Sequence, residues 1–387
     1  MNVVYFEGIK TMKDRTNRSY LQRVRIEGYK SFGSGDDAVE IDLKDVNILI
    51  GANGSGKSNF ISFFTMLSNM MTGNLQNYVG INGTSEDLLH FGSRVTPMIE
   101  ASLEFYNMKN TDVYSFSLVK STQDTLIIAG EEIKRDHKQT LISSGRKESF
   151  FYLDEVRMDY EKSIRNILER CRAYQFHDTS SRSNIRNNPR IDNNKYLYSD
   201  AGNLAAYLYM LKTCSDKTRR YYDRILRRIR DVIPGFDGFV LEPQALNSNY
   251  IRLNWTQTNH KEYFFGPEQI SDGSLRFMAL ATLFLQPPEM LPNVIIIDEP
   301  ELGLHPQAID ALAMLIKTAS EHCQVIVATQ SARLLDSFAP EDILVVDRDK
   351  EKQVSRICRL EEEKLDKWLE DYSLSQLWEK NVIGGQP

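Results

Sequence analysis

The pattern of hydrophobic and polar positions changes along the chain. Apolar and polar residues alternate over 21–26 and again over 97–133, a period of two that predicts half-buried strands and an antiparallel region. The apolar run 46–50 predicts a further strand, and the turn-forming residues 33–37 separate it from the first. Residues 21–50 are therefore expected to form two strands and a turn. Apolar residues then recur at three- and four-residue spacing, which predicts a helix with one buried face: Phe60, Phe63, Phe64, Leu67 and Met71.

The middle of the chain carries mainly helical patterns, and the last third alternates. Helices are expected over 160–174 and 201–233, with a mobile loop over 179–194, which is rich in Ser, Asn and Arg. Short strands are expected at 250–254 and 261–265. Helical and strand patterns then alternate over 275–285, 294–297, 308–319, 324–328, 332–338 and 343–346. This alternation predicts a parallel sheet covered on both faces by helices.

These patterns predict an α/β fold with a mixed or parallel sheet, an antiparallel β subdomain and a helical insertion. We expect an N-terminal extension over 1–20, an N-terminal lobe over 21–160, a helical insertion or lid over 161–262, a C-terminal lobe over 263–350 and a tail over 351–387. The tail carries the aromatic residues Trp368, Tyr372 and Trp378, which are expected to dock on the chain's own head or on a partner.

Composition narrows the class of protein. The 387 residues can bury a large core, and the longest apolar stretches are strand-sized, so no membrane span is expected. Residues 1–20 lack an apolar signal core, and four scattered cysteines predict neither a zinc knuckle nor a disulfide framework. A reducing, cytoplasmic location is therefore expected. The net charge of −6 requires any nucleic-acid contact to come from a local basic patch.

A glycine-rich segment carries the first candidate chemistry. Residues 51–58 match G-x-x-x-x-G-K-[ST] between a predicted strand and a predicted helix, which is the setting that a phosphate-binding loop requires. Backbone N–H groups of such a loop surround phosphate oxygens, Lys57 neutralises phosphate charge and the Ser58 hydroxyl binds Mg²⁺. The residues predicted to bind ATP here are Gly51, Asn53, Gly54, Ser55, Gly56, Lys57, Ser58 and Asn59.

A pair of acidic residues ends a buried strand far along the chain. The apolar run 294–297 leads into Asp298 and Glu299. Asp298 is expected to hold Mg²⁺ opposite Ser58, and Glu299 to polarise the attacking water as a general base. The alternative is an ordinary core strand with two exposed acids at its end. The presence of a phosphate loop in the same chain makes this alternative less favoured.

A short serine–glycine segment precedes the helix at 275–285. Ser271, Asp272, Gly273 and Ser274 lie at its start, where the two serines can cap the helix, and capping alone would explain them. The other interpretation is that this helix start reaches the γ-phosphate bound to a second subunit.

Together these segments resemble the ABC-type ATPase heads of RecF, SMC and OLD-like proteins, a group often labelled AAA family or AAA_21-type. Residues 26–32 are similar to the opening strand and turn of such heads, and 51–58 to Walker A. Residues 270–274 resemble the ABC signature, 294–299 Walker B and 301–306 the D-loop. The resemblance spans residues 21–346 and is vague through the middle. It implies that two heads sandwich two ATP molecules with Mg²⁺, each site combining one subunit's phosphate loop with the other's residues 271–274.

Two positions depart from the family pattern. Asp272 stands where transporters usually carry glycine, and Gln330 stands where many ABC ATPases have histidine. A glutamine can hydrogen-bond a γ-phosphate but cannot carry a positive charge. We therefore expect Gln330 to act with Glu299 and Lys57 in catalysis, with slow turnover and ATP serving partly as a clamp.

Other polar residues are assigned more modest roles. His305 is expected to be a structural loop histidine, and His177 and Asp178 to have packing or loop-anchoring roles. Asp347 and Asp349 superficially resemble the Asp-x-Asp of Toprim nucleases, but their strand is already used by the predicted ATPase sheet and no nuclease is expected.

The resemblance implies an ATP hydrolase that forms a homodimer, or a higher-order assembly, and gates a separately encoded effector such as a nuclease in bacterial antiphage defence. One alternative is a RecF-like repair ATPase that binds duplex DNA, and another is a slowly hydrolysing scaffold. Arginines interleave with apolar residues over 219–230, either as a solvated helix face or as a contact to DNA or RNA phosphates. The loop arginines Arg182, Arg186 and Arg190 share this ambiguity.

Overall fold

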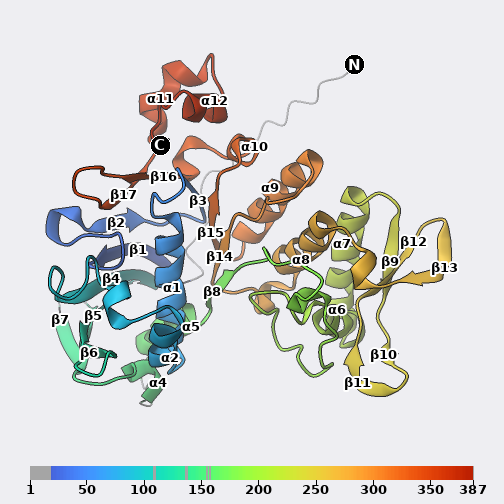
Figure 1. The fold of residues 1–387 in the computed structure, drawn as a ribbon, viewed down its shortest axis with the longest axis horizontal. Helices are drawn as coiled ribbons and strands as arrows, with labels where there is room; N and C mark the ends of the chain where they lie inside the picture. The colour runs from blue at the N-terminus through green and yellow to red at the C-terminus, as the bar shows by residue number, and fades with distance from the viewer. Residues whose placement is uncertain (1–18, 108–109, 136–137, 154–155, 157, 387) are drawn as a thin grey trace.

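The chain is described here by a computed structural model that covers residues 19–107, 110–135, 138–153, 156 and 158–386. The expected N-terminal extension lies outside the described residues, apart from Ser19 and Tyr20. Figure 1 shows a β-rich half and a half of helices and small sheets on either side of a central sheet, with the last two helices at the top.

The first sheet is antiparallel, with strand order β2-β1-β4-β5-β6-β7. Its strands are β1 (Tyr20–Glu27), β2 (Val39–Asp42), β4 (Met98–Asn107), β5 (Asn110–Lys120), β6 (Leu126–Arg135) and β7 (Lys138–Ser143). The expected antiparallel region is therefore present. The expectation of two strands before residue 50 is wrong, because the four-residue β2 pairs with β1 and makes a third. Two buried positions in so short a strand give little periodic signal.

The second sheet forms the centre of the molecule, with strand order β17-β16-β3-β15-β14-β8. It contains β3 (Val46–Ile50), β8 (Cys171–Tyr174), β14 (Val294–Asp298), β15 (Gln324–Thr329), β16 (Ile343–Arg348) and β17 (Ser355–Arg359). All neighbouring strands are parallel except β17, which runs antiparallel to β16.

Helices cover both faces of this sheet, as predicted. Leu49, Ile296 and Ile326 belong to the core beneath α1 (Lys57–Met71). Their neighbours Ile48, Ile295 and Val325 belong to the opposite core, beneath α8 (Asp272–Leu285) and α9 (Pro306–Ser320). This alternation follows from the two-residue period of a strand, and it explains why these strands are apolar throughout.

The middle of the chain differs from expectation in three places. The helix predicted over 160–174 is α5 (Asp159–Glu169), and its expected end is instead the strand β8. The helix predicted over 201–233 is two helices, α6 (Leu204–Thr213) and α7 (Asp216–Val232), because the Ser215 side chain caps α7. The strand expected at 250–254 is wrong, because these residues span the end of β11 (Asn247–Ile251) and the start of β12 (Asn254–Gln257). The strands of this region make two small sheets: β9 (Phe236–Val240), β12 and β13 (His260–Phe265) in one, and β10 (Pro243–Gln244) and β11 in the other.

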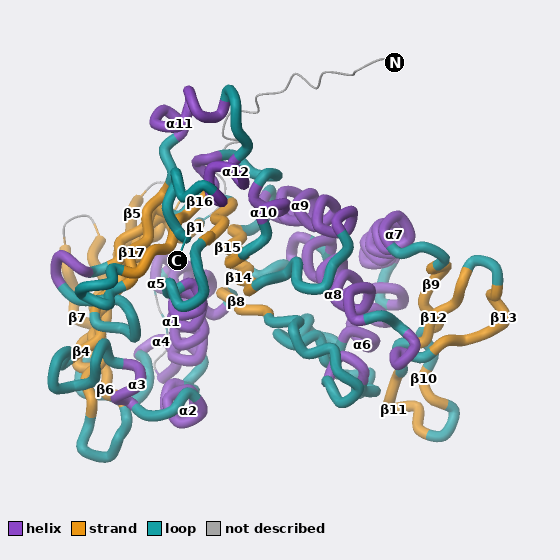
Figure 2. Tube along the Cα trace, turned by 45° about the horizontal axis from the view of Figure 1, so that its top comes forward, coloured by secondary structure: helices purple, strands orange, loops and turns teal. Residues whose placement is uncertain are grey.

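Short helices complete the fold. Three lie in the β-rich half, namely α2 (Leu75–Ile81), α3 (Ser85–Leu88) and α4 (Phe150–Leu153). The helix predicted over 332–338 is the shorter α10 (Ala332–Leu335), and α11 (Glu362–Leu369) and α12 (Leu374–Glu379) follow β17. Figure 2 shows α12 beside α10 and α11 further out.

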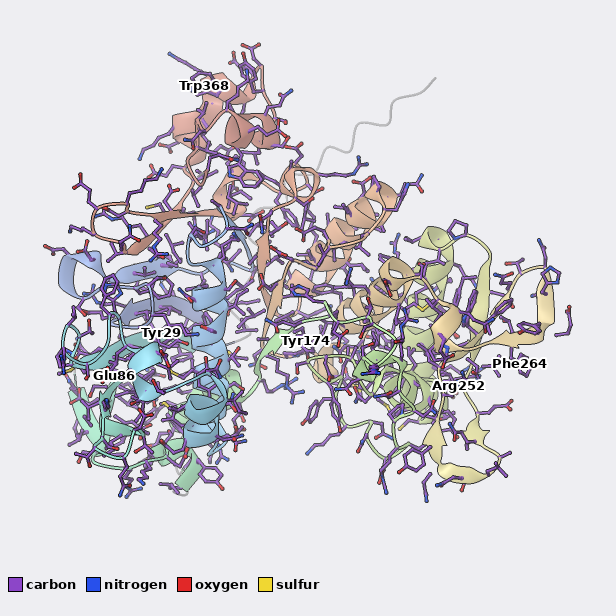
Figure 3. All side chains as sticks on the ribbon, viewed as in Figure 1. Tyr29, Glu86, Tyr174, Arg252, Phe264 and Trp368 are labelled. Carbon is purple, nitrogen blue, oxygen red and sulfur yellow. The ribbon has the colours of Figure 1, made fainter. Side chains whose placement is uncertain are left out.

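The tail docks on the chain's own head through α12. Trp378 is 8% exposed, and the Asp336 carboxylate accepts hydrogen bonds from the N–H and hydroxyl of Ser375 at the start of α12. Trp368 on α11 is 45% exposed and points outward at the top of the molecule (Figure 3). In the parts of the chain that the structure describes, no helix combines the length and apolar character of a membrane span.

A buried carboxylate anchors the β-rich half. Glu131 on β6 is fully buried and accepts hydrogen bonds from the Tyr114 hydroxyl (2.6 Å), the Ser149 hydroxyl (2.6 Å) and the Phe150 N–H (2.8 Å). A buried charge is tolerated only when its oxygens are paired in this way. The residue thereby ties β5, β6 and the start of α4 together.

Replacing Glu131 with alanine is expected to lower the free energy of unfolding by about 3–5 kcal/mol, because three donors lose their acceptor at roughly 1–1.5 kcal/mol each and a cavity forms. Urea denaturation measures the change. Glu100→Ala, an exposed carboxylate on β4, is the control and should shift stability by less than about 0.5 kcal/mol. Equal effects of the two substitutions would contradict an anchoring role for Glu131.

Candidate functional site

The phosphate loop (residues 51–58) connects β3 to α1 at the edge where the central strands end. Gly56 has φ +121°, and a Cβ atom there would lie 2.3 Å from the Ser355 hydroxyl oxygen. Only glycine combines this conformation with so close an approach. The Ser355 hydroxyl lies 2.5 Å from the Ser55 carbonyl oxygen and 2.7 Å from the Ser31 hydroxyl. The loop is therefore supported by β17 and by the turn after β1, and no pattern in the sequence identified either support.

Lys57, the first residue of α1, is buried beneath the loop. Its Nζ donates hydrogen bonds to the carbonyl oxygens of Gly51 (2.6 Å) and Ala52 (3.0 Å). Burial lowers the pKa of Lys57, and the nearby carboxylates of Glu299, Asp298 and Glu301 act in the opposite direction. The cation is thus held among carbonyl and carboxylate oxygens, and two of its donors have acceptors within the loop itself.

Asp298 lies at the end of β14, in reach of the phosphate loop. Burial raises the pKa of its carboxyl group, and the neighbouring Glu299 adds to this effect. His177, Lys57 and a hydrogen bond with the Ser58 side chain act in the opposite direction. The two predicted metal ligands, Ser58 and Asp298, are therefore hydrogen-bonded neighbours, although they lie far apart in the sequence.

Gln330 connects the three segments of the site. Its Nε2 donates one hydrogen bond to Asn53 Oδ1 of the phosphate loop at 2.8 Å and another to Glu299 Oε1. A carboxamide has two N–H hydrogens, so this arrangement engages both of them. Glu299 itself has φ +39°, a conformation that costs about 1–3 kcal/mol for a non-glycine residue.

His177 also belongs to this site. It follows the unpredicted strand β8, and its Nε2 lies 2.8 Å from the backbone carbonyl oxygen of Asp298. The loop-anchoring role expected from the sequence agrees with this bond, but the sequence did not indicate that the anchor is Asp298. Recognising β8 as a core strand would have placed His177 at the sheet edge that carries the other polar residues.

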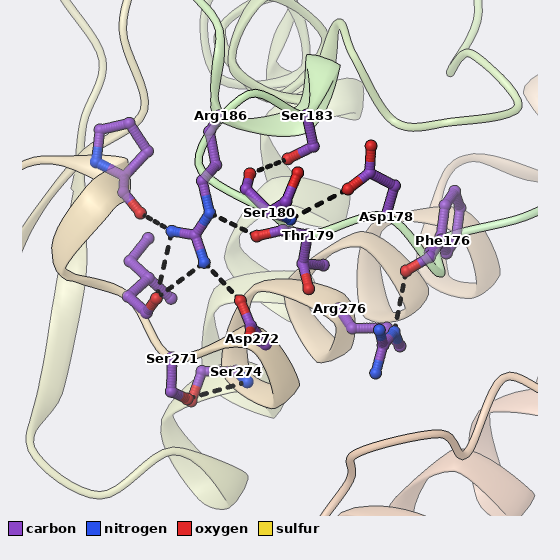
Figure 4. Close-up of polar contacts among 12 residues, drawn as sticks. Phe176, Asp178, Thr179, Ser180, Ser183, Arg186, Ser271, Asp272, Ser274 and Arg276 are labelled. Carbon is purple, nitrogen blue, oxygen red and sulfur yellow. Dashed lines mark hydrogen bonds and ion pairs between the residues drawn. The ribbon is translucent and has the colours of Figure 1, made fainter.

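The signature segment (residues 271–274) begins α8 in the other half of the molecule. The Ser271 hydroxyl oxygen accepts the Ser274 N–H at 3.2 Å and lies 2.8 Å from the Ser274 hydroxyl, so the expected helix cap is present. The Asp272 carboxylate faces Arg186 at 2.7 Å, which lowers the pKa of Asp272 (Figure 4).

Arg186 is buried, so the suggestion that it contacts nucleic-acid phosphates is wrong. Besides Asp272, its guanidinium donates to the carbonyl oxygens of Thr179 (2.7 Å), Ile270 (3.1 Å) and Pro267. Figure 4 shows the side chain reaching from the 179–186 loop to the residues before α8. The segment predicted as a mobile loop is thereby bonded to the start of the signature helix.

Arg276, one helical turn into α8, makes a second connection of this kind. It is 4% exposed and donates to the carbonyl oxygens of Phe176 (2.8 Å), His177 (3.0 Å) and Leu302. Burial lowers the pKa of Arg276, and the charge of Asp272 opposes that effect. A buried guanidinium satisfied by carbonyl oxygens has no sequence signature, and neither arginine was predicted as part of the site.

The D-loop (residues 301–306) lies directly against the signature helix. A Cβ atom on Gly273 would be 2.3 Å from the Gly303 carbonyl oxygen. His305 caps α9 by accepting the Gln307 N–H at 3.4 Å, in agreement with its expected structural role. Signature segment and D-loop share a cavity of about 420 Å³, and no residue of the phosphate loop lines it.

The structure thus assembles one group of the predicted site residues and leaves another apart. Asn53, Lys57, Ser58, Asp298, Glu299 and Gln330 form one cluster. Ser271, Asp272, Gly273 and Ser274 make their contacts with the 179–186 loop and the D-loop instead. A second cavity, of about 490 Å³, borders the start of α1 and is lined by Lys30, Ser31, Asn59, His90, Phe91 and Arg348 among others.

The fold is similar to solved heads of SMC proteins. The SMC head bound to the C-winged helix domain of ScpA is 17% identical, with a TM-score of 0.58 over 90% of this chain and 99% of that chain. The head with an extended coiled coil from Pyrococcus furiosus, bound to the C-terminal domain of ScpA, gives 17% identity and a TM-score of 0.57 over 91% and 99%. The SMC head domain from Thermotoga maritima gives 15% and 0.50 over 88% and 99%. No curated protein matches the chain.

The fold is therefore that of an ABC-type ATPase head such as those of SMC proteins. The chain belongs to the AAA_21 family, described as "AAA domain, putative AbiEii toxin, Type IV TA system", whose model matches residues 46–336. The expected resemblance and fold class are therefore confirmed. The family and the fold are those of ATPases that use a nucleotide.

Gly273→Ala is expected to push the D-loop away from the signature helix and to lower the free energy of unfolding by about 1–3 kcal/mol, because the added methyl group meets a backbone oxygen. Chemical denaturation measures this change. Gly80→Ala in α2 is the matched control, because nothing lies within 4 Å of its Cβ position, and it should leave stability equal or raised by up to about 1 kcal/mol. A Gly273→Ala protein as stable as the control would contradict the close contact.

Proposed function

We propose that two copies of this chain bind ATP between them, each site combining the phosphate loop of one subunit with the signature segment of the other. The separation of the signature segment from the phosphate loop within one chain carries this proposal. The serine hydroxyls of Ser271 and Ser274 lie at the start of the fourteen-residue helix α8, whose N-terminal dipole favours an anion. Exchanging these surfaces between identical subunits gives a closed two-fold dimer.

The residues of the cluster fit a nucleotide with its magnesium ion. Bound ATP–Mg²⁺ supplies the phosphoanhydride bond and the charge of the metal. Lys57 would neutralise phosphate charge, the backbone of residues 54–58 would donate N–H groups, and Ser58 with Asp298 would hold Mg²⁺. The raised pKa of Asp298 supports this role, because a buried carboxylate beside Glu299 gains most from a divalent cation. The cavity of about 490 Å³ beside Asn59 offers space for the base and sugar.

Hydrolysis would depend on Glu299 as the group that takes a proton from water. Gln330 now donates to both Glu299 and Asn53, so it must exchange one of these bonds before it can donate to a γ-phosphate. This requirement supports slow turnover, with ATP acting partly as a clamp. His177 would be a positioning residue, because it binds the backbone of the metal-holding Asp298.

The dimer would gate a separately encoded effector, such as a nuclease, in bacterial antiphage defence. Three observations support this part of the proposal. The chain's own family is described as a putative toxin of a toxin–antitoxin system, two of the similar SMC heads are bound to domains of ScpA, and Trp368 on the outer helix α11 is exposed.

Glu299→Gln is expected to convert the chain from a monomer–dimer mixture to a stable dimer when ATP and Mg²⁺ are present, because the amide cannot accept the proton of the attacking water. Light scattering measures the mass, and affinity purification at native expression identifies any protein that the trapped dimer retains. Lys57→Ala is the control and should remain monomeric. A Glu299→Gln chain that stays monomeric at saturating ATP would falsify the shared site. A wild-type dimer that never releases phosphate would instead indicate the scaffold function.

Mixing two inactive variants tests the exchange of surfaces directly. Lys57→Ala disables the phosphate loop and Ser271→Arg blocks the signature segment, so each variant alone has no intact shared site. A dimer of one copy of each contains one intact site and one doubly defective site. Part of the wild-type activity should therefore return on mixing only if signature and phosphate loop act on opposite subunits.

A second candidate function is the binding of nucleic acid by α7. Arg219, Arg220, Arg224, Arg227 and Arg230 lie on its exposed side, and within the described part of the chain none forms an ion pair with a carboxylate. These side chains are spread along about 16 Å of helix, at 1.5 Å per residue, which allows several contacts with a phosphate backbone. This surface supports the RecF-like alternative independently of the ATP site.

Arg220→Gln/Arg224→Gln/Arg227→Gln is expected to weaken duplex DNA binding and to reduce the slope of log affinity against log salt concentration by about 2–3, at about 0.9 per lost phosphate contact. Fluorescence anisotropy at several salt concentrations measures both quantities. Arg333→Gln is the control, because that exposed arginine is already paired with Asp310 at 2.6 Å. An unchanged salt slope in the triple variant would exclude α7 as the contact surface.

A further inference from the structure

Glu301, the first residue of the D-loop, contacts the segment that carries Gln330. Its Oε1 accepts the Thr329 hydroxyl at 2.5 Å and the Gln330 backbone N–H at 3.2 Å. The carboxylate therefore binds the backbone at the point from which the Gln330 side chain extends toward Glu299 and Asn53. Thr329 is fully buried at the end of β15.

The second carboxylate oxygen of Glu301, Oε2, is buried and has no hydrogen-bond partner among the residues that the structure describes, which is unusual for a carboxylate. Burial raises the pKa of Glu301, while the bonds from Thr329 and Gln330 act against that effect. An unpaired buried oxygen costs about 1–3 kcal/mol, so stability alone does not account for a carboxylate at this position.

Glu301 also connects the Gln330 backbone to the D-loop, which packs against the signature helix. Its own carbonyl oxygen accepts the Leu304 N–H at 2.9 Å, which shapes the D-loop. One residue before Leu304, the Gly303 carbonyl oxygen packs against Gly273 of the signature helix. A displacement of the D-loop therefore moves the acceptor that holds the Gln330 backbone.

We infer that Glu301 is a positioning residue for hydrolysis: its carboxylate sets Gln330, and through the Gln330 carboxamide it sets Glu299 and Asn53. The inference rests on the proposed ATPase site. It adds that a shift of the D-loop would change the position of Glu299, the glutamate proposed to activate water. Glu301 hydrogen-bonds the backbone of the bridging residue, whereas the hydrogen bonds of Lys57 and Ser58 go to Gly51, Ala52 and Asp298. Its loss should therefore reduce the rate of the chemical step and leave ATP binding intact.

The test compares Glu301→Ala, Glu301→Gln and Thr329→Val in steady-state ATP hydrolysis by the full chain. Glu301→Ala is expected to lower kcat by about tenfold to a hundredfold, because displacements of about 1 Å at a reacting centre have effects of this size. KM for ATP should stay within about twofold, since Lys57 and Ser58 keep their contacts. Glu301→Gln retains an oxygen that accepts both bonds and should keep kcat within about threefold of wild type. Thr329→Val removes one of the two bonds and should be intermediate.

Glu131→Gln provides the matched control for stability. It changes a buried, hydrogen-bonded carboxylate in the other sheet and should lower the melting temperature without lowering kcat. A Glu301→Ala protein with normal kcat, or with a raised KM and no change in kcat, would overturn the positioning role. A folded Glu301→Gln protein whose kcat is as low as that of Glu301→Ala would also overturn the positioning role.

A separate measurement distinguishes this inference from the proposed assembly. The double variant Glu299→Gln/Glu301→Ala should still dimerise with ATP and Mg²⁺ in light scattering, because Glu301 is not needed to bind phosphate. If neither this variant nor Glu299→Gln dimerises while wild-type turnover still depends on Glu301, the shared site is wrong and the positioning role stands. A wild-type chain without any ATP turnover would contradict the positioning role as well.

Discussion

The parallel pairing of β3, β15 and β14 is the constraint on which the site depends. Ala328 on β15 pairs with Leu49 on β3 and also with Asp298 on β14. Because the carboxyl ends of parallel strands meet at one edge of a sheet, this register brings the phosphate loop, Asp298 and Gln330 together. A shift of one residue in either pairing would turn the apolar side chains of a strand to the opposite core. The packing of the two hydrophobic cores therefore determines which polar residues meet at the sheet edge.

The sequence predicted the groups that are proposed to act on a nucleotide, because each belongs to a short pattern with a local physical reason. A glycine-rich turn before a helix and two acids after an apolar run can be recognised without their partners. The residues that position these groups lack such patterns. The four-residue β8 is defined by its pairing with β14, and His177 becomes part of the site only through that pairing. Arg186 and Arg276 resemble exposed loop and helix residues until their carbonyl acceptors are known.

These two arginines explain how a helix that lies apart from the phosphate loop keeps a defined position relative to it. Both guanidinium groups are buried, and each bonds backbone carbonyl oxygens from more than one segment. The desolvation of a buried cation is offset only when several of its donors are satisfied, so the segments must keep their arrangement for the bonds to form. The start of α8 is thus fixed to the loop that continues from β8, and through His177 to Asp298.

The contact between Gly56 and Ser355 has a consequence for synthesis of the protein. The proposed phosphate loop is made early, but the hydroxyl group that supports the Ser55 carbonyl oxygen belongs to a strand, and Ser355 follows Ser55 by 300 positions. On the ribosome, the β-rich half emerges well before β17 exists to pair with β16, and domains assemble as their segments appear. A nascent chain therefore carries the complete glycine pattern without its supporting strand. Competence to hold a nucleotide is therefore expected only once translation has passed β17, and the proposed pairing of two copies would be delayed until that strand is made.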